Sequence, residues 1–224
     1  MGSHDTLALS RRQLLGASLV LAGISVWRPV VALAQAQPRQ TPEQVLGPFY
    51  PVLKGIDRGS DLTAIPGRPG RAQGQVIYVL GRVINLKGEP LRGAKVEIWQ
   101  ANTHGRYVHP SDTNSAPLDH AFEGYGAQLT DGEGRYRFKT IRPGAYPTGV
   151  GDWIRPPHIH FDVMGRVNRL VTQMYFDGDA LNDKDRILQR VGCKECLTTK
   201  LLPPTREMEA DALVAPWDIV LARG

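Results

Sequence analysis

The sequence predicts an all-β protein: a β-sandwich with long irregular N-terminal and C-terminal segments and one short helix. Two observations support this fold class. Short runs of β-branched or alternating apolar residues recur from residue 76 onwards, and turn signals separate them. Glycine and proline are also abundant, with 24 and 17 copies among 224 residues, which suits strands joined by turns better than a bundle of helices.

Each expected element has its own local signal. Residues 76–84 form a β-branched run that ends at the turn-forming segment 86–90, and residues 94–99 alternate apolar and polar side chains. Residues 131–134 form a hairpin-type turn before the alternating segment 136–139, without the spacing of an EF-hand calcium loop. The remaining expected elements are strands at 158–163, 170–176 and 217–221 and a helix at 183–191.

Composition excludes several classes of protein. A chain of 224 residues can bury a sizeable core without disulfide support, and two cysteines are too few for a disulfide framework or a multi-cysteine metal fold. The formal net charge is +5, but residues 1–36 contribute a surplus of two, and no basic run with interleaved aromatic residues follows. We therefore expect no nucleic-acid partner.

The first 36 residues resemble a cleaved export signal of the twin-arginine type. Arg11 and Arg12 precede an apolar run over 14–27, which Arg28 and a proline interrupt after 14 residues, short of the roughly 20 that a membrane-spanning helix needs. Small residues around position 34 offer cleavage points. This predicts a periplasmic or secreted protein that leaves the cell folded and has no membrane partner in its mature form.

His158 and His160 are the sharpest local signal for chemistry. Residues two apart on a strand point to the same face, so both imidazoles project together while Ile159 packs on the other face. Two prolines, Pro156 and Pro157, stiffen the approach to this strand. Taken alone, the pair fits either a metal site or two packed histidines.

Two tyrosines in turn-like segments are further candidates. Tyr107 lies within 105–109 and Tyr146 within 143–147, between expected strands, where functional groups often lie. Taken alone, each is better explained as a packed aromatic residue with a satisfied hydroxyl.

Eight motifs, taken in order, resemble the intradiol ring-cleavage dioxygenases, with protocatechuate 3,4-dioxygenase β chains as the most similar branch. The resemblance is continuous over residues 76–179, and 47–50 is a weaker match upstream. It implies that 37–75 is an irregular segment before a catalytic β-sandwich domain over 76–224. The eight motifs are 81–83, 93–102, 105–107, 116–119, 129–131, 143–147, 155–161 and 172–176.

The resemblance implies a mononuclear Fe(III) ion held by Tyr107, Tyr146, His158 and His160. This donor set suits a hard, highly charged cation, because phenolate oxygens are anionic and the metal's charge deprotonates phenols that otherwise titrate near 10. Neutral imidazoles complete the set.

The resemblance also implies roles for individual residues. Tyr146 leaves the metal and accepts a substrate proton, whereas Tyr107 stays bound. Arg155 stabilises negative charge that develops on the ring, and Gln173 lies near the histidines and orients ligands. Trp99 packs close to the site. The substrates are then a catechol-type ring and O2, and the product is a cis,cis-muconate-type diacid.

The chain departs from the family pattern at two positions near the site. Thr148 stands where a pocket-lining tryptophan is expected, which predicts a wider or more polar mouth, and Asp162 stands where a glycine is expected. Protocatechuate, catechol, hydroxyquinol and larger phenols therefore all remain open as substrates. Cys193 and Cys196 fit no motif of the family; in an exported protein they can form a local disulfide.

Two other functions compete with this interpretation. A non-catalytic β-sandwich binding module would share the fold, but would have no reason to keep four ligands and Arg155 together. A zinc hydrolase at the histidine pair fails on the tyrosines, which zinc rarely uses, and on the lack of a carboxylate base in a familiar motif. The sequence leaves open whether the chain forms a homo-oligomer or needs a second chain.

Overall fold

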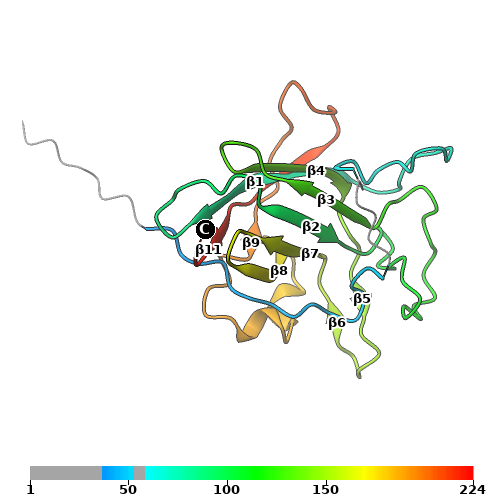
Figure 1. The fold of residues 1–224 in the computed structure, drawn as a ribbon. Coiled ribbons are helices and arrows are strands. Elements are labelled where there is room, and N and C mark those ends of the chain that lie inside the picture. Colours follow the sequence, from blue (N-terminus) through cyan, green and yellow to red (C-terminus); the bar gives the residue numbers. More distant parts are fainter. Residues whose placement is uncertain (1–36, 53–58, 224) are drawn as a thin grey trace, which may run out of the picture. The chain divides into compact units, whose positions relative to one another are not determined.

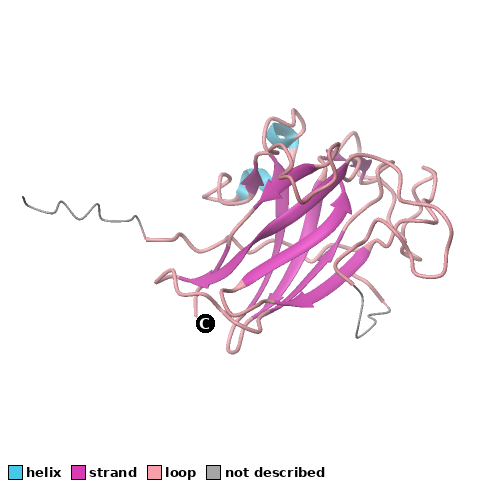
Figure 2. Cartoon of the chain, turned by 90° about the horizontal axis from the view of Figure 1, so that it is seen from above, coloured by secondary structure: helices cyan, strands magenta, loops and turns pink. Residues whose placement is uncertain are grey.

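The computed structural model describes residues 37–52 and 59–223, so the predicted export signal over 1–36 lies outside the described residues. These residues belong to one compact unit, 36–224. Figure 1 traces the fold along the chain, and Figure 2 shows that strands dominate it.

Two β-sheets form the body of this unit. The first is built on β1 (Val76–Asn85), which pairs antiparallel with β4 (Arg135–Ile141) and parallel with β10 (Leu213–Pro216) and β11 (Ile219–Leu221). The second has the order β3 (Tyr125–Leu129), β2 (Lys95–Trp99), β7 (His158–Met164), β8 (Arg169–Phe176) and β9 (Thr198–Thr199). A separate two-stranded sheet joins β5 (Tyr146–Pro147) to β6 (Ile154–Arg155).

The hydrophobic core lies between the two large sheets and confirms the all-β sandwich. Val79 and Phe138 of the first sheet share one buried cluster with Ile98 and Phe161 of the second. The Phe161 ring also lies 4.8 Å from the ring of Trp217, which precedes β11. All six expected strands are present.

The expected helix at 183–191 is wrong. The structure has two short 3-10 turns instead, η1 (Asn182–Lys184) and η2 (Leu188–Arg190), and no α-helix occurs in 37–52 or 59–223. Between the turns Asp185 has an extended backbone, with ψ at 111°. Its carboxylate accepts the backbone N–H groups of Ile187 and Leu188 at 2.7 and 3.3 Å, and this local capping replaces helical hydrogen bonds.

Residues 41–50, here called the N-terminal strap, run alongside β8 toward β5 (Figure 1). Thr41 anchors the strap to β11, because its N–H donates to the Val220 carbonyl at 3.1 Å and its hydroxyl accepts the Val220 N–H at 2.9 Å. Further along, Gln44 N–H donates to the Val171 carbonyl on β8 at 2.8 Å. The strap therefore lies along the edge of the fold where the predicted site residues gather.

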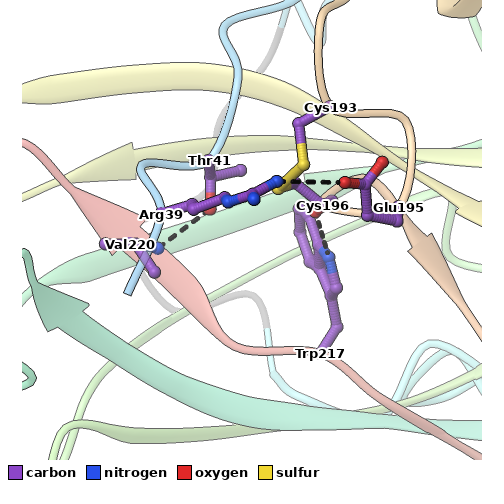
Figure 3. Close-up of a disulfide and its surroundings, with 7 residues drawn as sticks. All are labelled: Arg39, Thr41, Cys193, Glu195, Cys196, Trp217 and Val220. Atoms are coloured by element: carbon purple, nitrogen blue, oxygen red, sulfur yellow. Dashed lines mark hydrogen bonds and ion pairs between the residues drawn. A yellow bond between two sulfur atoms is a disulfide. The ribbon is translucent and has the colours of Figure 1, made fainter. Parts of the chain in front are cut away.

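Cys193 and Cys196 form a disulfide, as the sequence allowed. Figure 3 shows it beside the Trp217 indole, whose N–H donates to the Cys196 carbonyl at 3.0 Å. Arg39 reaches Glu195 of the same loop at 3.2 Å. Within the described residues, no helix has the length and apolar character that crossing a membrane requires.

Candidate active site

The two predicted histidine ligands lie together on the outward face of β7. Their Nε2 atoms are 3.2 Å apart, and both side chains are at least 98% buried, with 2% and 1% exposure. The His158 Nδ1 atom lies 2.6 Å from the Pro156 carbonyl, so it carries the proton and leaves Nε2 as a lone-pair donor. Both Nε2 atoms are therefore close enough for one ion about 2.1 Å from each, the usual metal–imidazole distance.

Electrostatics keeps both imidazoles neutral, as metal ligation requires. Burial lowers the pKa of His158 and of His160 well below the usual value, and the nearby charge of Arg155 lowers both further. A neutral histidine needs no proton released before it binds a cation.

The predicted tyrosine ligands converge on the same place from two other segments. Tyr146 lies on β5, and its ring centroid is 5.6 Å from that of His158; Tyr107 follows β2 in a loop, and its ring centroid is 6.2 Å from that of His160. The two tyrosine rings meet edge to face at 5.5 Å. The loop holds Tyr107 through its backbone N–H, which donates to Asp112 at 2.7 Å.

Both phenols are set up as neutral groups that only a cation would ionise. Burial raises the pKa of Tyr107 well above its ordinary value and raises the pKa of Tyr146 as well, although the charge of Arg155 counteracts the shift at both tyrosines. The Tyr107 hydroxyl is buried beside the Tyr146 phenol and makes no well-formed hydrogen bond to any residue that the structure describes. Such an orphaned oxygen is costly unless a ligand satisfies it.

The donor chemistry fits ferric iron. In the described part of the chain, no group of three or more His, Cys, Asp or Glu side chains could hold a metal. Among the described residues, the adjacent tyrosines are the side chains placed to complete a site at His158 and His160. Two phenolate oxygens and two imidazoles match a hard trivalent ion better than zinc.

Arg155 lies at the centre of a buried polar network beside the histidines. Its Nη2 atom donates to Gln173 Oε1 at 2.7 Å and to the Tyr175 hydroxyl at 3.0 Å, and its Nε atom donates to Asp185 at 2.8 Å. The Gln173 amide nitrogen donates to the Val45 carbonyl in the N-terminal strap at 2.8 Å. Gln173 therefore holds Arg155 and the strap, and it lies opposite His160 in the β7–β8 register; its role in orienting ligands stays a prediction.

Aromatic and backbone groups wall the site on two sides. The Trp99 ring, close to the site as predicted, stacks on His160 at 4.8 Å with 12° between the planes. On the strap, Phe49 lies 4.6 Å from the Tyr107 ring, and an added Cβ at Gly47 would lie 3.0 Å from His160 Cε1. Gly47 has φ at +78°, so glycine suits both its backbone and its close approach to the ring.

The two departures from the family pattern have structural explanations. Thr148 hydrogen-bonds the Trp153 carbonyl at 3.1 Å, and the Trp153 ring lies 5.9 Å from the Arg155 guanidinium carbon. A tryptophan on the other arm of the β5–β6 hairpin thus stands beside Arg155. Asp162 does not touch a histidine; it forms a two-point ion pair with Arg169 at 2.8 and 2.9 Å and accepts the Tyr50 hydroxyl at 2.8 Å.

Sequence reasoning did not single out Asp185 or Tyr175 as site residues, although both hydrogen-bond Arg155. Asp185 lies in the segment taken as a helix, and Tyr175 lies in a strand that reads as core. Only the tertiary fold brings them next to Arg155, which lies 30 and 20 residues away in the sequence.

A cavity of about 290 Å³ lies next to Tyr107 and Trp99, and Phe49 and Val108 also line it.

Known proteins place this fold and site in a class. Residues 45–223 match the family model described as Dioxygenase. The chain is 45% identical to the protocatechuate 3,4-dioxygenase beta chain of Burkholderia cepacia, over 80% of this chain and 79% of that protein. It is 33% identical to a catechol 1,2-dioxygenase of Candida albicans, over 62% of this chain and 48% of that protein.

Solved structures of similar fold are also dioxygenases. A catechol 1,2-dioxygenase from an Acinetobacter species superimposes with a TM-score of 0.63 at 27% identity, over 82% of this chain and 63% of that one. A dioxygenase domain from a cellulolytic Streptomyces species gives a TM-score of 0.60 at 26% identity, over 83% of this chain and all of that one. The chain therefore belongs to the intradiol ring-cleavage dioxygenase family, a class of oxidoreductases.

Proposed function

We propose that this protein is an exported, Fe(III)-dependent intradiol dioxygenase that cleaves a catechol-type ring with O2 to a cis,cis-muconate-type diacid. One observation carries the proposal: two neutral imidazoles and two buried phenols, one of them without a well-formed hydrogen bond to any described residue, meet at one point of the fold.

Tyr107, Tyr146, His158 and His160 would hold the iron. Ferric iron bound there would supply the Lewis acidity and one-electron chemistry that activates a catechol ring towards O2. The protein itself contributes a dry site, because all four side chains are at least 93% buried, with 7% exposure at most. Exclusion of water strengthens every charge interaction within it.

The structure supports different roles for the two tyrosines. Tyr146 is the more exposed, at 7% against 3%, and pairs through β5–β6 with Arg155, so it can take a proton from a substrate hydroxyl next to a cation. Tyr107 is packed by Phe49 and fixed by its loop. It is suited to remain a ligand throughout the reaction.

Mutating each tyrosine tests this assignment together with the metal. The purified protein should contain one iron per chain and be red-brown, because phenolate–Fe(III) is coloured and zinc is not. Tyr146→Phe should keep a visible band yet bind catechol about 10²–10⁴-fold more slowly, since it lacks a positioned base. Tyr107→Phe should shift the band and lose iron. Bound zinc and no visible band after iron supplementation would refute the proposal. If Tyr107→Phe binds catechol slowly and Tyr146→Phe binds it at the wild-type rate, the roles of the two tyrosines are reversed.

Substrate breadth is a second part of the proposal. Thr148 replaces a large aromatic side chain with a small polar one, although Trp153 from the other arm of the hairpin lies beside Arg155. We expect this change to admit catechols without a ring carboxylate. Relatives named for protocatechuate, catechol and hydroxyquinol cleavage all match the chain. Catechol, 4-methylcatechol, hydroxyquinol and protocatechuate should be assayed side by side; strict dependence on the carboxylate would contradict the inference from Thr148.

Export through a twin-arginine signal is the third part. The Cys193–Cys196 disulfide supports it, because disulfides persist mainly in oxidising compartments. Residues 1–36 fused to a reporter that is active only after folded export should give a signal, and Arg11→Lys with Arg12→Lys should abolish it. A reporter that stays in the cytoplasm with both arginines intact would refute the localisation.

A further inference from the structure

Asp185 is a buried charge that the predicted iron ligands do not explain. Its side chain is fully buried, with 0% exposure, and lies between the two 3-10 turns. The two carboxylate oxygens act on different partners. Oδ1 accepts the backbone N–H groups that begin the second turn, and Oδ2 accepts the Nε–H of Arg155 at 2.8 Å.

The Arg155 guanidinium is held on one side only. Nε is engaged by Asp185, and Nη2 is engaged by Gln173 and Tyr175. Nη1 takes part in none of these three hydrogen bonds, and the guanidinium also faces the Tyr146 phenol, whose raised pKa it partly counteracts. Because the guanidinium is planar, fixing Nε and Nη2 also fixes the direction of the two Nη1–H groups.

We propose that Asp185 is a positioning residue for ring cleavage, which orients Arg155 so that its Nη1–H groups are the free donors for negative charge on the substrate. The inference rests on the role of Arg155 in the proposed function. Asp185 itself does not touch the substrate; it acts through the guanidinium.

Charge balance supports the same role. Arg155 is buried beside His158 and His160, whose imidazoles are neutral, and Asp185 is the one anion among the described residues that forms an ion pair with it. A buried cation without a counter-ion is strongly unfavourable and tends to move towards water. Asp185 makes Arg155 half of a neutral pair, which keeps the guanidinium in the dry site as a donor.

The same loop contains a matched control. Asp179 accepts the backbone N–H of Leu181 through Oδ1 at 3.0 Å, beside the first 3-10 turn, and pairs with Arg142 through Oδ2 at 2.9 Å. Both carboxylates thus accept turn N–H groups through Oδ1 and an arginine through Oδ2, although the Asp179–Arg142 pair is more exposed than the Asp185–Arg155 pair. Arg142 lies by the Phe176 ring rather than by the predicted iron ligands, so only the pair at Asp185 reaches the site.

The experiment compares Asp185→Asn with Asp179→Asn, Arg155→Gln and the double variant Arg155→Gln with Asp185→Asn. The asparagine keeps an oxygen that can accept the N–H groups of the turn, but it removes the negative charge that faces Arg155. On iron-loaded enzyme with catechol, Asp185→Asn should lower kcat/KM by about 10²-fold, the usual cost of a misplaced group, and Asp179→Asn should leave it near the wild-type value. Adding Asp185→Asn to Arg155→Gln should cost nothing more, because the two residues act as a unit.

A second measurement needs no iron. In the metal-free protein the Arg155 Nε–H proton should give a protected NMR resonance, identified by its loss in Arg155→Gln. Asp185→Asn should remove that protection, and Asp179→Asn should leave it. If Asp185→Asn fails to fold, the double variant replaces it, because it leaves no unpaired buried charge. Its kcat/KM is then compared with that of Arg155→Gln alone.

The outcomes separate this proposal from the proposed function. If Asp185→Asn keeps the wild-type kcat/KM while Arg155→Gln loses activity, the positioning role is overturned and the proposed function stands. An Asp185→Asn effect that persists in full on the Arg155→Gln background shows a role in the turn instead, and also overturns it. Full activity in Arg155→Gln overturns the positioning role, because Asp185 then has no catalytic group to orient, and leaves the function standing. An inactive wild type with a protected Nε–H refutes the function alone.

Discussion

Acid should destabilise the metal-free protein through its two site histidines. His158 and His160 have folded-state pKa values well below the ordinary 6.5, first because they are buried and then because Arg155 lies near. Above pH 6.5 both are neutral whether the chain is folded or unfolded, and they cost nothing. Below pH 6.5 the unfolded chain takes up two protons that the folded protein refuses, so the free energy of unfolding falls as the pH falls.

The size of the effect follows from two refused protons. Each contributes about 1.36 kcal/mol per pH unit, so the limiting slope is about 2.7 kcal/mol per unit. Integrated from pH 7.5 to pH 5, the loss is about 4 kcal/mol, a large part of the roughly 5–15 kcal/mol that stabilises a typical domain.

Urea denaturation of the metal-free protein at several pH values between 7.5 and 5 would measure the loss. His158→Asn serves as the control, because it removes one titrating group and should halve the slope below pH 6.5. Histidine NMR resonances followed over the same range should show His158 and His160 unchanged in the folded protein. A stability that stays flat from pH 7.5 to 5, or an equal slope in His158→Asn, would refute the assignment of both imidazoles as buried and neutral.

Three further perturbations test other parts of the structure. Gly47→Ala should lower the free energy of unfolding, measured by urea denaturation, by about 1–3 kcal/mol and weaken iron binding, since φ is +78° and the new Cβ would press on His160. Gly67→Ala, at φ +79° with open space around it, should leave iron binding unchanged. Iron affinity should rise about 100-fold per pH unit in a chelator competition at neutral pH, because burial raises the pKa of both tyrosine ligands and each must lose a proton; Tyr146→Phe should reduce this to about tenfold. Phe161→Ala should lower the free energy of unfolding by about 3–5 kcal/mol, since the ring is fully buried in the core.

The sequence was sufficient for the strands that carry the site. On β7 the alternation of Ile159 and Phe161 with the two histidines fixes which face each side chain occupies, and the structure has that arrangement. The same kind of reasoning failed at 183–191. Its apolar spacing is helical, but a buried carboxylate at Asp185 takes the local N–H groups and a distant arginine, and no local pattern contains that contact.

The sequence predicted only those site residues that lie in recognisable motifs. The residues carried over by motif lie together, but the groups that hold them do not share a segment with them. Gly47 contacts a histidine more than 100 residues away, and Gln173 bonds to Val45 in the strap across 128 residues. Such contacts are set by how the strap lies on the sheet, which depends on tertiary packing rather than on local propensity.

The anchoring of the strap has a consequence for the timing of synthesis. The strap walls the site with residues made early, yet Thr41 is tied to Val220, a few residues from the C-terminus (Figure 3). A ribosome that has delivered every predicted iron ligand, the last being His160, has still about 60 residues to add before that tie can form. The growing chain therefore has its predicted donors long before it has the enclosure around them, and the strap can be anchored over the site only after β11 has been made.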